Sequence, residues 1–210
     1  MPRRKVANPL ALAVLACLAE RPMHPYEMAS TMRERGKHES IKLNYGSLYT
    51  VVESLQKHDL IAPQETVKEG RRPERTVYAI TEAGRLEYTD WLSELLSTPV
   101  KEFSAFEAGL SLAGGLPPED VLRLLTQRAA LLQAEINGNR TMLEYAREQG
   151  VPRLFLIEGD YRIALKETEL EFVRKLAASI ADGSLEGIDY WREAYRQFEA
   201  GEVITAFEPR

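Results

Sequence analysis

The sequence has little cysteine, because Cys17 is the only one among 210 residues. A disulfide within the chain is therefore impossible, and the apolar neighbours of Cys17 indicate a small buried residue rather than a redox switch. Long hydrophobic runs are also lacking, since no apolar stretch approaches the roughly 18 residues that a membrane span needs. The basic N-terminus precedes an apolar stretch, but residues 19–22 form a poor cleavage site for a signal peptidase, and we expect a cytoplasmic protein without a membrane partner.

The motifs of common enzymes and metal sites are absent as well. There is no phosphate-binding P-loop, no Gly-x-Ser-x-Gly, no His-Glu-x-x-His and no G-x-G-x-x-G after a predicted strand. The three histidines, His24, His38 and His58, are far apart in the sequence, so neither a zinc site nor a Cys–His pair is indicated. We expect no catalytic residues, no metal and no cofactor, and we interpret the protein as a non-enzyme.

Acidic residues outnumber basic ones, and a formal net charge of −5 by itself argues against a nucleic-acid partner. The excess is confined to one half of the chain. Residues 1–84 hold 13 Lys/Arg and 10 Asp/Glu, a balance of +3, whereas residues 85–210 hold 14 and 22, a balance of −8. We therefore predict two domains with different roles, residues 1–84 and 85–210.

The first part of the chain is predicted to form three helices. The first two span residues 10–19 and 26–35, with Pro25 in the first turn of the second and Gly36 at its end. The third runs from Asn44, a typical N-cap residue, to about residue 58. Its expected inward face recurs at spacings of three and four: Leu48, Val51, Val52 and Leu55. Its outward face carries hydrogen-bonding side chains that can approach base edges: Tyr45, Ser47, Tyr49, Thr50, Ser54 and Lys57.

A β-hairpin is predicted next, with extended stretches over residues 61–67 and 75–80. Gly70 and Pro73 mark the turn between them, and Thr81 caps a fourth helix. The order of helix, helix, helix, hairpin and helix is that of a winged helix-turn-helix, whose third helix enters the major groove of DNA.

From residue 82 onward the chain is predicted to be helical, with breaks at residues 98–99 and 114–118. A coiled-coil-like seam between residues 119 and 149 comprises Leu122, Leu125, Ala129, Leu132, Ile136, Asn139 and Leu143. A second long helix over residues 153–182 carries Tyr161, Leu165, Thr168, Phe172, Leu176 and Ile180, and Gly150 and Gly183 end the two helices. Two long helices cannot bury both faces alone, so we expect a homodimer, with a helical hairpin inside one chain as the alternative. The predicted fold class is mainly α: an N-terminal winged helix-turn-helix with a two-stranded wing, and an α-helical dimerisation domain.

Three groups of residues resemble the PadR family of transcriptional regulators, over most of the chain. They are LAERPMHPYE at residues 18–27, GSLY at residues 46–49 with Leu55, and GRRP at residues 70–73 followed by YAITEAG at residues 78–84. Pro25 stands where many members have glycine, and proline suits a helix start. The resemblance implies a homodimer that binds a palindromic operator in double-stranded DNA, usually as a repressor released by a small-molecule effector.

Candidate DNA contacts lie on the third helix and on the wing. Short donors and acceptors on a helix read base edges in the major groove, while tyrosine and lysine side chains suit phosphates. For Asn44 the alternative is capping alone, for Tyr49 packing alone, and for the flanking Lys42 and Lys57 simple solvation. Residues 3–5 are either a basic arm for the minor groove or a disordered end. The predicted DNA-binding residues are Lys42, Asn44, Tyr45, Ser47, Tyr49, Thr50, Arg71, Arg72 and Arg75.

An effector would need an apolar cavity between subunits. Four aromatic residues are candidates to line it, with ordinary core or interface packing as the alternative: Trp91, Tyr161, Tyr190 and Trp191. A rival function is a helical adaptor whose winged domain binds protein, because fold alone does not determine function.

Overall fold

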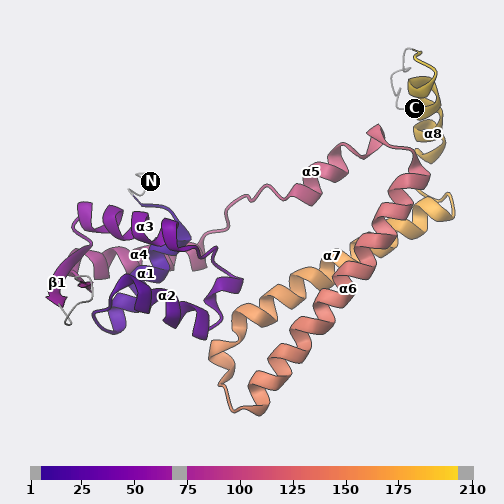
Figure 1. Ribbon diagram of the computed structural model, residues 1–210. Coiled ribbons are helices and arrows are strands. Elements are labelled where there is room, and N and C mark those ends of the chain that lie inside the picture. The colour runs from indigo at the N-terminus through magenta and orange to yellow at the C-terminus, as the bar shows by residue number, and fades with distance from the viewer. Residues whose placement is uncertain (1–5, 68–74, 203–210) are drawn as a thin grey trace. The chain divides into compact units, whose positions relative to one another are not determined.

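The computed structural model describes residues 6–67 and 75–202 and is mainly helical (Figure 1). In chain order its elements are α1 (Pro9–Glu20), α2 (Pro25–Glu34), η1 (Lys37–Glu39), α3 (Tyr45–Lys57), β1 (Ile61–Val67), β2 (Arg75–Ile80), α4 (Glu82–Ser97), α5 (Ala105–Ser111), η2 (Ala113–Gly115), α6 (Pro118–Glu148), η3 (Arg153–Phe155), α7 (Ile157–Ala181) and α8 (Ile188–Glu199). The chain divides into two compact units, Met1–Lys101 and Glu102–Arg210. The predicted mainly helical fold with a winged helix-turn-helix and a two-stranded wing is confirmed.

The first unit has one apolar core, built around α1. Nearly every apolar side chain of α1 is buried, and α2 contributes Met28, Ala29 and Met32. The four residues predicted to face inward on α3 are all buried there: Leu48, Val51, Val52 and Leu55. The predicted helix starts are also present, since Pro25 is the first residue of α2 and the Asn44 side chain caps α3.

Helix α4 belongs to this first unit, because Trp91 is buried in the same core. The units therefore divide between Lys101 and Glu102 rather than between residues 84 and 85, a position that lies inside α4. The boundary between residues 84 and 85 is predicted from charge, which reflects the composition of the surface. Core packing follows the apolar side chains instead, and in this core α4 packs against α1.

Strands β1 and β2 form the antiparallel wing, with bounds that match the predicted stretches. Their register pairs Ile61 with Ile80, and it shifts between Pro63 and Glu65. On its other side β2 pairs with the loop between α1 and α2, where the backbone N–H groups of Met23 and Tyr78 donate to each other's carbonyl oxygens at 3.1 and 3.0 Å. The base of the wing is thereby joined to the helices of the same unit.

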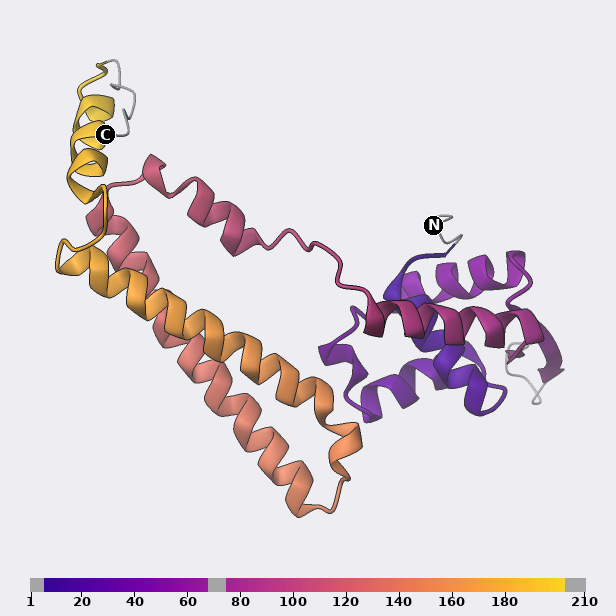
Figure 2. The ribbon, with the colours of Figure 1, turned by 180° about the vertical axis from the view of Figure 1, so that it is seen from behind.

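In the second unit, α6 and α7 lie side by side as an antiparallel pair (Figures 1 and 2). Their shared core contains Leu132 and Ile136 from α6 and Leu170 and Val173 from α7. The helical hairpin inside one chain, the alternative to pairing between subunits, is therefore present. Gly150 has the positive φ of 77° that commonly ends a helix, as predicted for its position after α6.

Helix α7 differs from its prediction in two respects. It begins at Ile157, because Arg153–Phe155 forms a separate 3-10 turn. The stripe of six residues is also divided between two sides: Leu176 and Ile180 pack in the shared core together with Ile163, Leu170 and Val173. The other four residues of the stripe are exposed, namely Tyr161, Leu165, Thr168 and Phe172. The helix is apolar on more than one side, so periodicity alone could not select the side that packs.

Helices α5 and α8 pack against the same unit. The guanidinium carbon of Arg128 on α6 lies 3.8 Å from the centre of the Phe106 ring on α5. The indole Nε1 of Trp191 on α8 donates to the carbonyl oxygen of Leu116 at 2.9 Å. These contacts connect the two shorter helices to the α6–α7 pair.

Candidate nucleic-acid interface

The outward side of α3 carries four of the nine predicted contact residues. Because Leu48, Val51 and Leu55 are buried against α1 and α2, the opposite side of α3 is open to solvent. On that side the structure gathers Tyr45, Ser47, Tyr49 and Thr50, of which only Ser47 is partly buried. This end of the first unit therefore presents aromatic and hydroxyl groups on a single helix.

Asn44 caps α3, which is the alternative to DNA contact that the sequence left open for this residue. The side-chain Oδ1 accepts a hydrogen bond from the backbone N–H of Ser47 at 2.7 Å. This bond satisfies one of the N–H groups that have no partner within the helix. It occupies the carbonyl oxygen of Asn44 and does not involve the amide N–H groups, which could donate to a ligand.

The hydroxyl of Thr50 is also engaged within α3. Its Oγ1 donates to the carbonyl oxygen of Gly46 at 3.1 Å. Thr50 therefore presents a methyl group and an acceptor oxygen to solvent, a combination that suits a thymine methyl or a base amino group.

Tyr45 contacts two residues of α2 that sequence reasoning did not select. Its ring is stacked with that of Tyr26, with centres 6.1 Å apart and an interplanar angle of 11°. The guanidinium carbon of Arg33 lies 4.5 Å from the centre of the Tyr45 ring, and Arg33 Nη1 donates to Tyr45 Oη at 2.5 Å. Tyr26 and Arg33 are two helical turns apart on α2, so their shared outward side was the signal available in the sequence.

The two flanking lysines lie beyond opposite ends of the interface. Lys42 precedes the N-cap of α3, and Lys57 is its last residue. Both are exposed. A helix of 13 residues is about 20 Å long, so these ammonium groups can reach separate phosphates but not the same one.

Of the three wing arginines predicted to contact DNA, only Arg75 lies among the described residues. Arg75 begins β2 and pairs through its backbone with Val67. Arg71 and Arg72, like residues 3–5, lie outside the described residues. Their predicted contacts with DNA stay predictions.

The aromatic residues considered for an effector cavity belong to both units. Trp91 is buried in the core of the first unit, as ordinary packing would have it, while Tyr161, Tyr190 and Trp191 belong to the second. Tyr161 is exposed, and Trp191 packs through its bond to Leu116.

Among the residues that the structure describes, no group of three or more His, Cys, Asp or Glu is placed to hold a metal ion. No helix within residues 6–67 and 75–202 is long and apolar enough to cross a membrane. Cys17 belongs to α1 and its thiol is buried, and this burial raises the pKa of the thiol.

The geometry of the first unit agrees with a comparison of sequences. Residues 14–90, from α1 to α4, match the transcriptional regulator PadR-like family. This segment of the chain is therefore similar to that family. The matched segment contains α2, α3 and both strands of the wing. No curated protein matches the sequence significantly.

Solved structures share the PadR-like fold over most of the chain. Bacillus subtilis PadR in complex with operator DNA is 18% identical, with a TM-score of 0.65 and coverage of 83% of this chain and 99% of that chain. A PadR-like transcriptional regulator from Bacillus cereus is 20% identical, with a TM-score of 0.56 and coverage of 83% and 99%. Bacillus subtilis PadR in complex with p-coumaric acid is 15% identical, with a TM-score of 0.65 and coverage of 82% and 98%. At these identities the likeness establishes a common fold.

Proposed function

We propose that this PadR-like regulator is a homodimeric repressor that binds a palindromic operator and releases it when a small effector binds. The observation that carries the proposal is the combination of an exposed polar side on α3 with an exposed apolar side on the α6–α7 pair. The first supplies contacts to base edges, and the second supplies a surface for a second copy.

The apolar side begins on α6. Leu124, Leu131 and Tyr145 are exposed and recur at multiples of seven residues, so they lie on one side of the helix. Met142, which is 72% exposed, adjoins them one turn away. Apolar side chains in such a row are seldom left in water on a folded protein, which favours burial by a partner.

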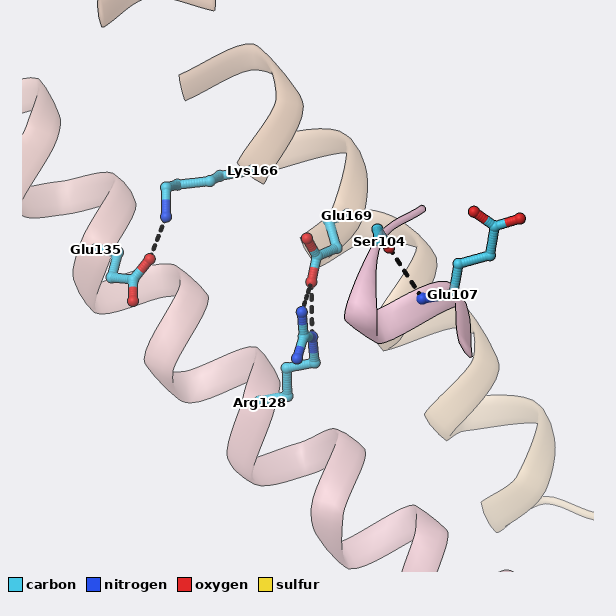
Figure 3. A network of polar contacts seen from close by, with 6 residues as sticks. All are labelled: Ser104, Glu107, Arg128, Glu135, Lys166 and Glu169. Carbon is cyan, nitrogen blue, oxygen red and sulfur yellow. Dashed lines mark hydrogen bonds and ion pairs between the residues drawn. The ribbon is translucent and has the colours of Figure 1, made fainter. Parts of the chain in front are cut away.

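The apolar side continues on α7 with Leu165 and Phe172, which flank Glu169 at spacings of four and three. On α6, Leu124 precedes Arg128 by one helical turn. Arg128 pairs with Glu169, and Glu135 pairs with Lys166, along one edge of the helix pair (Figure 3). Both apolar rows therefore border the same edge of the α6–α7 pair.

Helix α5 covers only one end of this edge. Phe106 packs on Arg128 there, with the Ser104 side chain capping α5 through the backbone N–H of Glu107 at 3.0 Å (Figure 3). The remaining apolar length fits a second copy of the same chain, because a two-fold contact needs a surface that is complementary to itself.

DNA binding is tested by selecting bound sequences from random duplex DNA with the purified full chain, at low and moderate salt. A dimer should enrich a palindrome whose half-site centres are about 34 Å apart, or a multiple of that distance. The Arg71→Ala/Arg72→Ala double variant should bind the selected duplex more weakly, with a salt dependence shallower by about 0.9 for each lost phosphate contact. Absence of any selected motif, or unchanged binding by the double variant, would favour the protein-binding adaptor.

Dimerisation is tested by sedimentation equilibrium. Leu131→Glu and Leu165→Glu should each produce a monomer of unchanged helicity, because a carboxylate would be buried in the contact. Thr126→Glu is the matched control, since Thr126 is exposed on another side of α6 and should leave the dimer intact. A wild-type chain that is monomeric throughout, or a Leu131→Glu variant that stays dimeric, would contradict the proposed contact.

Repression is tested by transcription in vitro from a promoter that carries the selected operator. The wild-type chain should lower the transcript yield, and an increase would contradict repression. Small aromatic molecules are then added one at a time. p-Coumaric acid comes first, because Bacillus subtilis PadR has been solved in complex with it. Release of the operator by one of them would support a small-molecule effector.

A further inference from the structure

The contacts of Tyr45 link the two helices of the helix-turn-helix at the surface. Tyr45 is the first residue of α3, and its ring meets Tyr26 and Arg33, which lie on one side of α2. Tyr26 is 60% exposed and Tyr45 40% exposed. Three large side chains thus contact one another at the surface. In such an exposed position, a guanidinium stacked on a phenol ring is only modestly attracted to it.

The charge of Arg33 is not neutralised by a carboxylate among the described residues. Two neighbouring arginines of the same unit are paired: Arg21 with Glu27 at 2.5 Å, and Arg35 with Glu20, whose pKa is lowered by that hydrogen bond. The contacts of Arg33 are instead with Tyr45. The guanidinium of Arg33 therefore places a positive charge beside the first turn of α3.

The hydrogen bond between Arg33 and Tyr45 has a direction that matters. Since Arg33 Nη1 donates to Tyr45 Oη, the phenolic O–H of Tyr45 keeps its own hydrogen for another acceptor. A hydroxyl that accepts from a cation becomes a stronger donor, because hydrogen bonds in a chain polarise each other. The donor lies beside a guanidinium whose charge no carboxylate neutralises among the described residues. The acceptor that best matches it is an anionic oxygen.

We propose that Arg33 is a positioning residue that holds Tyr45 so that its hydroxyl donates to a phosphodiester oxygen of bound duplex DNA. Tyr26 supports the same ring from the start of α2. The inference rests on the proposed DNA-binding function. It adds the residues that position one contact between α3 and the phosphate backbone of DNA.

The test measures affinity for the duplex that the wild-type full chain selects. Arg33→Lys keeps the charge but loses the planar guanidinium, and Tyr45→Phe keeps the ring but loses the hydroxyl. Each single variant should weaken binding about tenfold, the usual scale of a hydrogen bond to a charged group. The double variant should be no weaker than either single one, because both substitutions remove the same contact.

Arg35→Lys is the matched control, because Arg35 follows the same helix but pairs with Glu20. Arg35→Lys should bind the duplex like the wild type. All variants should have the unfolding temperature of the wild type. Tyr45→Phe should leave the salt dependence unchanged, since the hydroxyl is neutral.

Near-wild-type binding by Arg33→Lys, or multiplication of the two single effects in the double variant, would overturn the positioning role. A wild-type chain that binds no duplex would overturn the proposed function itself. The two failures are therefore distinguishable in one set of measurements.

Discussion

Gly84 lies so close to Leu60 that a Cβ atom on Gly84 would be 2.0 Å from the Leu60 carbonyl oxygen. The same oxygen accepts the backbone N–H of Thr81 at 3.1 Å. The hydroxyl of Thr81 accepts the N–H of Gly84 at 3.0 Å and donates to the carbonyl oxygen of Asp59 at 2.7 Å. The start of α4 is thereby joined to the chain that leads into the wing.

Gly84→Ala should destabilise the first unit by about 2–4 kcal/mol, because the methyl group would displace backbone rather than a flexible side chain. Urea unfolding followed by Trp91 fluorescence in a Trp191→Phe background reports this unit alone. Gly46→Ala is the matched control in α3, where a Cβ meets only Asn44 Oδ1 at 3.8 Å, and it should keep or slightly raise stability. Equal stability of the two variants would show that the contact at Leu60 can relax.

Substitutions at Asn44 separate helix capping from DNA contact. Asn44→Ala should lower the stability of the first unit by about 1 kcal/mol, because the N–H of Ser47 loses its partner. Asn44→Asp retains the cap and should keep the stability, but its negative charge should weaken operator binding at least about tenfold. Urea unfolding and fluorescence anisotropy with the selected duplex provide the two readouts. If Asn44→Asp binds the duplex like the wild type, Asn44 serves only as a cap.

Neighbouring residues on α7 should respond differently to truncation. Val173→Ala should cost about 2 kcal/mol at every protein concentration, because Val173 is fully buried against α6. Phe172 is 50% exposed, so Phe172→Ala should lower stability mainly at concentrations at which the dimer forms. Thermal unfolding at several protein concentrations distinguishes the two effects. A loss for Phe172→Ala that does not depend on concentration would contradict its placement in the dimer contact.

The thiol of Cys17 should react slowly in the folded chain. Burial raises its pKa, so at pH 8 the thiolate is scarcer than for an exposed cysteine, and access is blocked as well. Ellman's reagent should label the native chain far more slowly than the chain in denaturant, and the rate should begin to rise only at higher pH. Rapid labelling of the native chain at pH 8 would contradict the buried position.

Much of the local structure could be predicted from the sequence. Pro25 and Asn44 mark helix starts through their own backbone chemistry, and the apolar spacing of Leu48 and Leu55 defines the inner side of α3. Both strands of the wing have their predicted bounds. These features depend on neighbours a few residues away, which the sequence displays directly.

The candidate site was predicted only in part. Tyr45, Ser47, Tyr49 and Thr50 share the outward side of α3 because one helix carries them all. Arg33 was missed, since its role depends on a contact with a different helix. No periodicity within α2 indicates which side chain of α3 will lie beside it.

The sequence by itself determined the order of the elements and the winged helix, because caps, prolines and apolar spacing act over one or two turns. Tertiary structure alone decided that α4 joins the first unit through Trp91 and which side of α7 faces α6. Helix α7 carries apolar residues on more than one side, and the side that packs is the one on which Gly159 leaves room for Leu143. On that side Arg147 and Asp160 also meet at 2.7 Å. Such a choice depends on the shape and charge of the neighbouring helix, which no pattern within α7 contains.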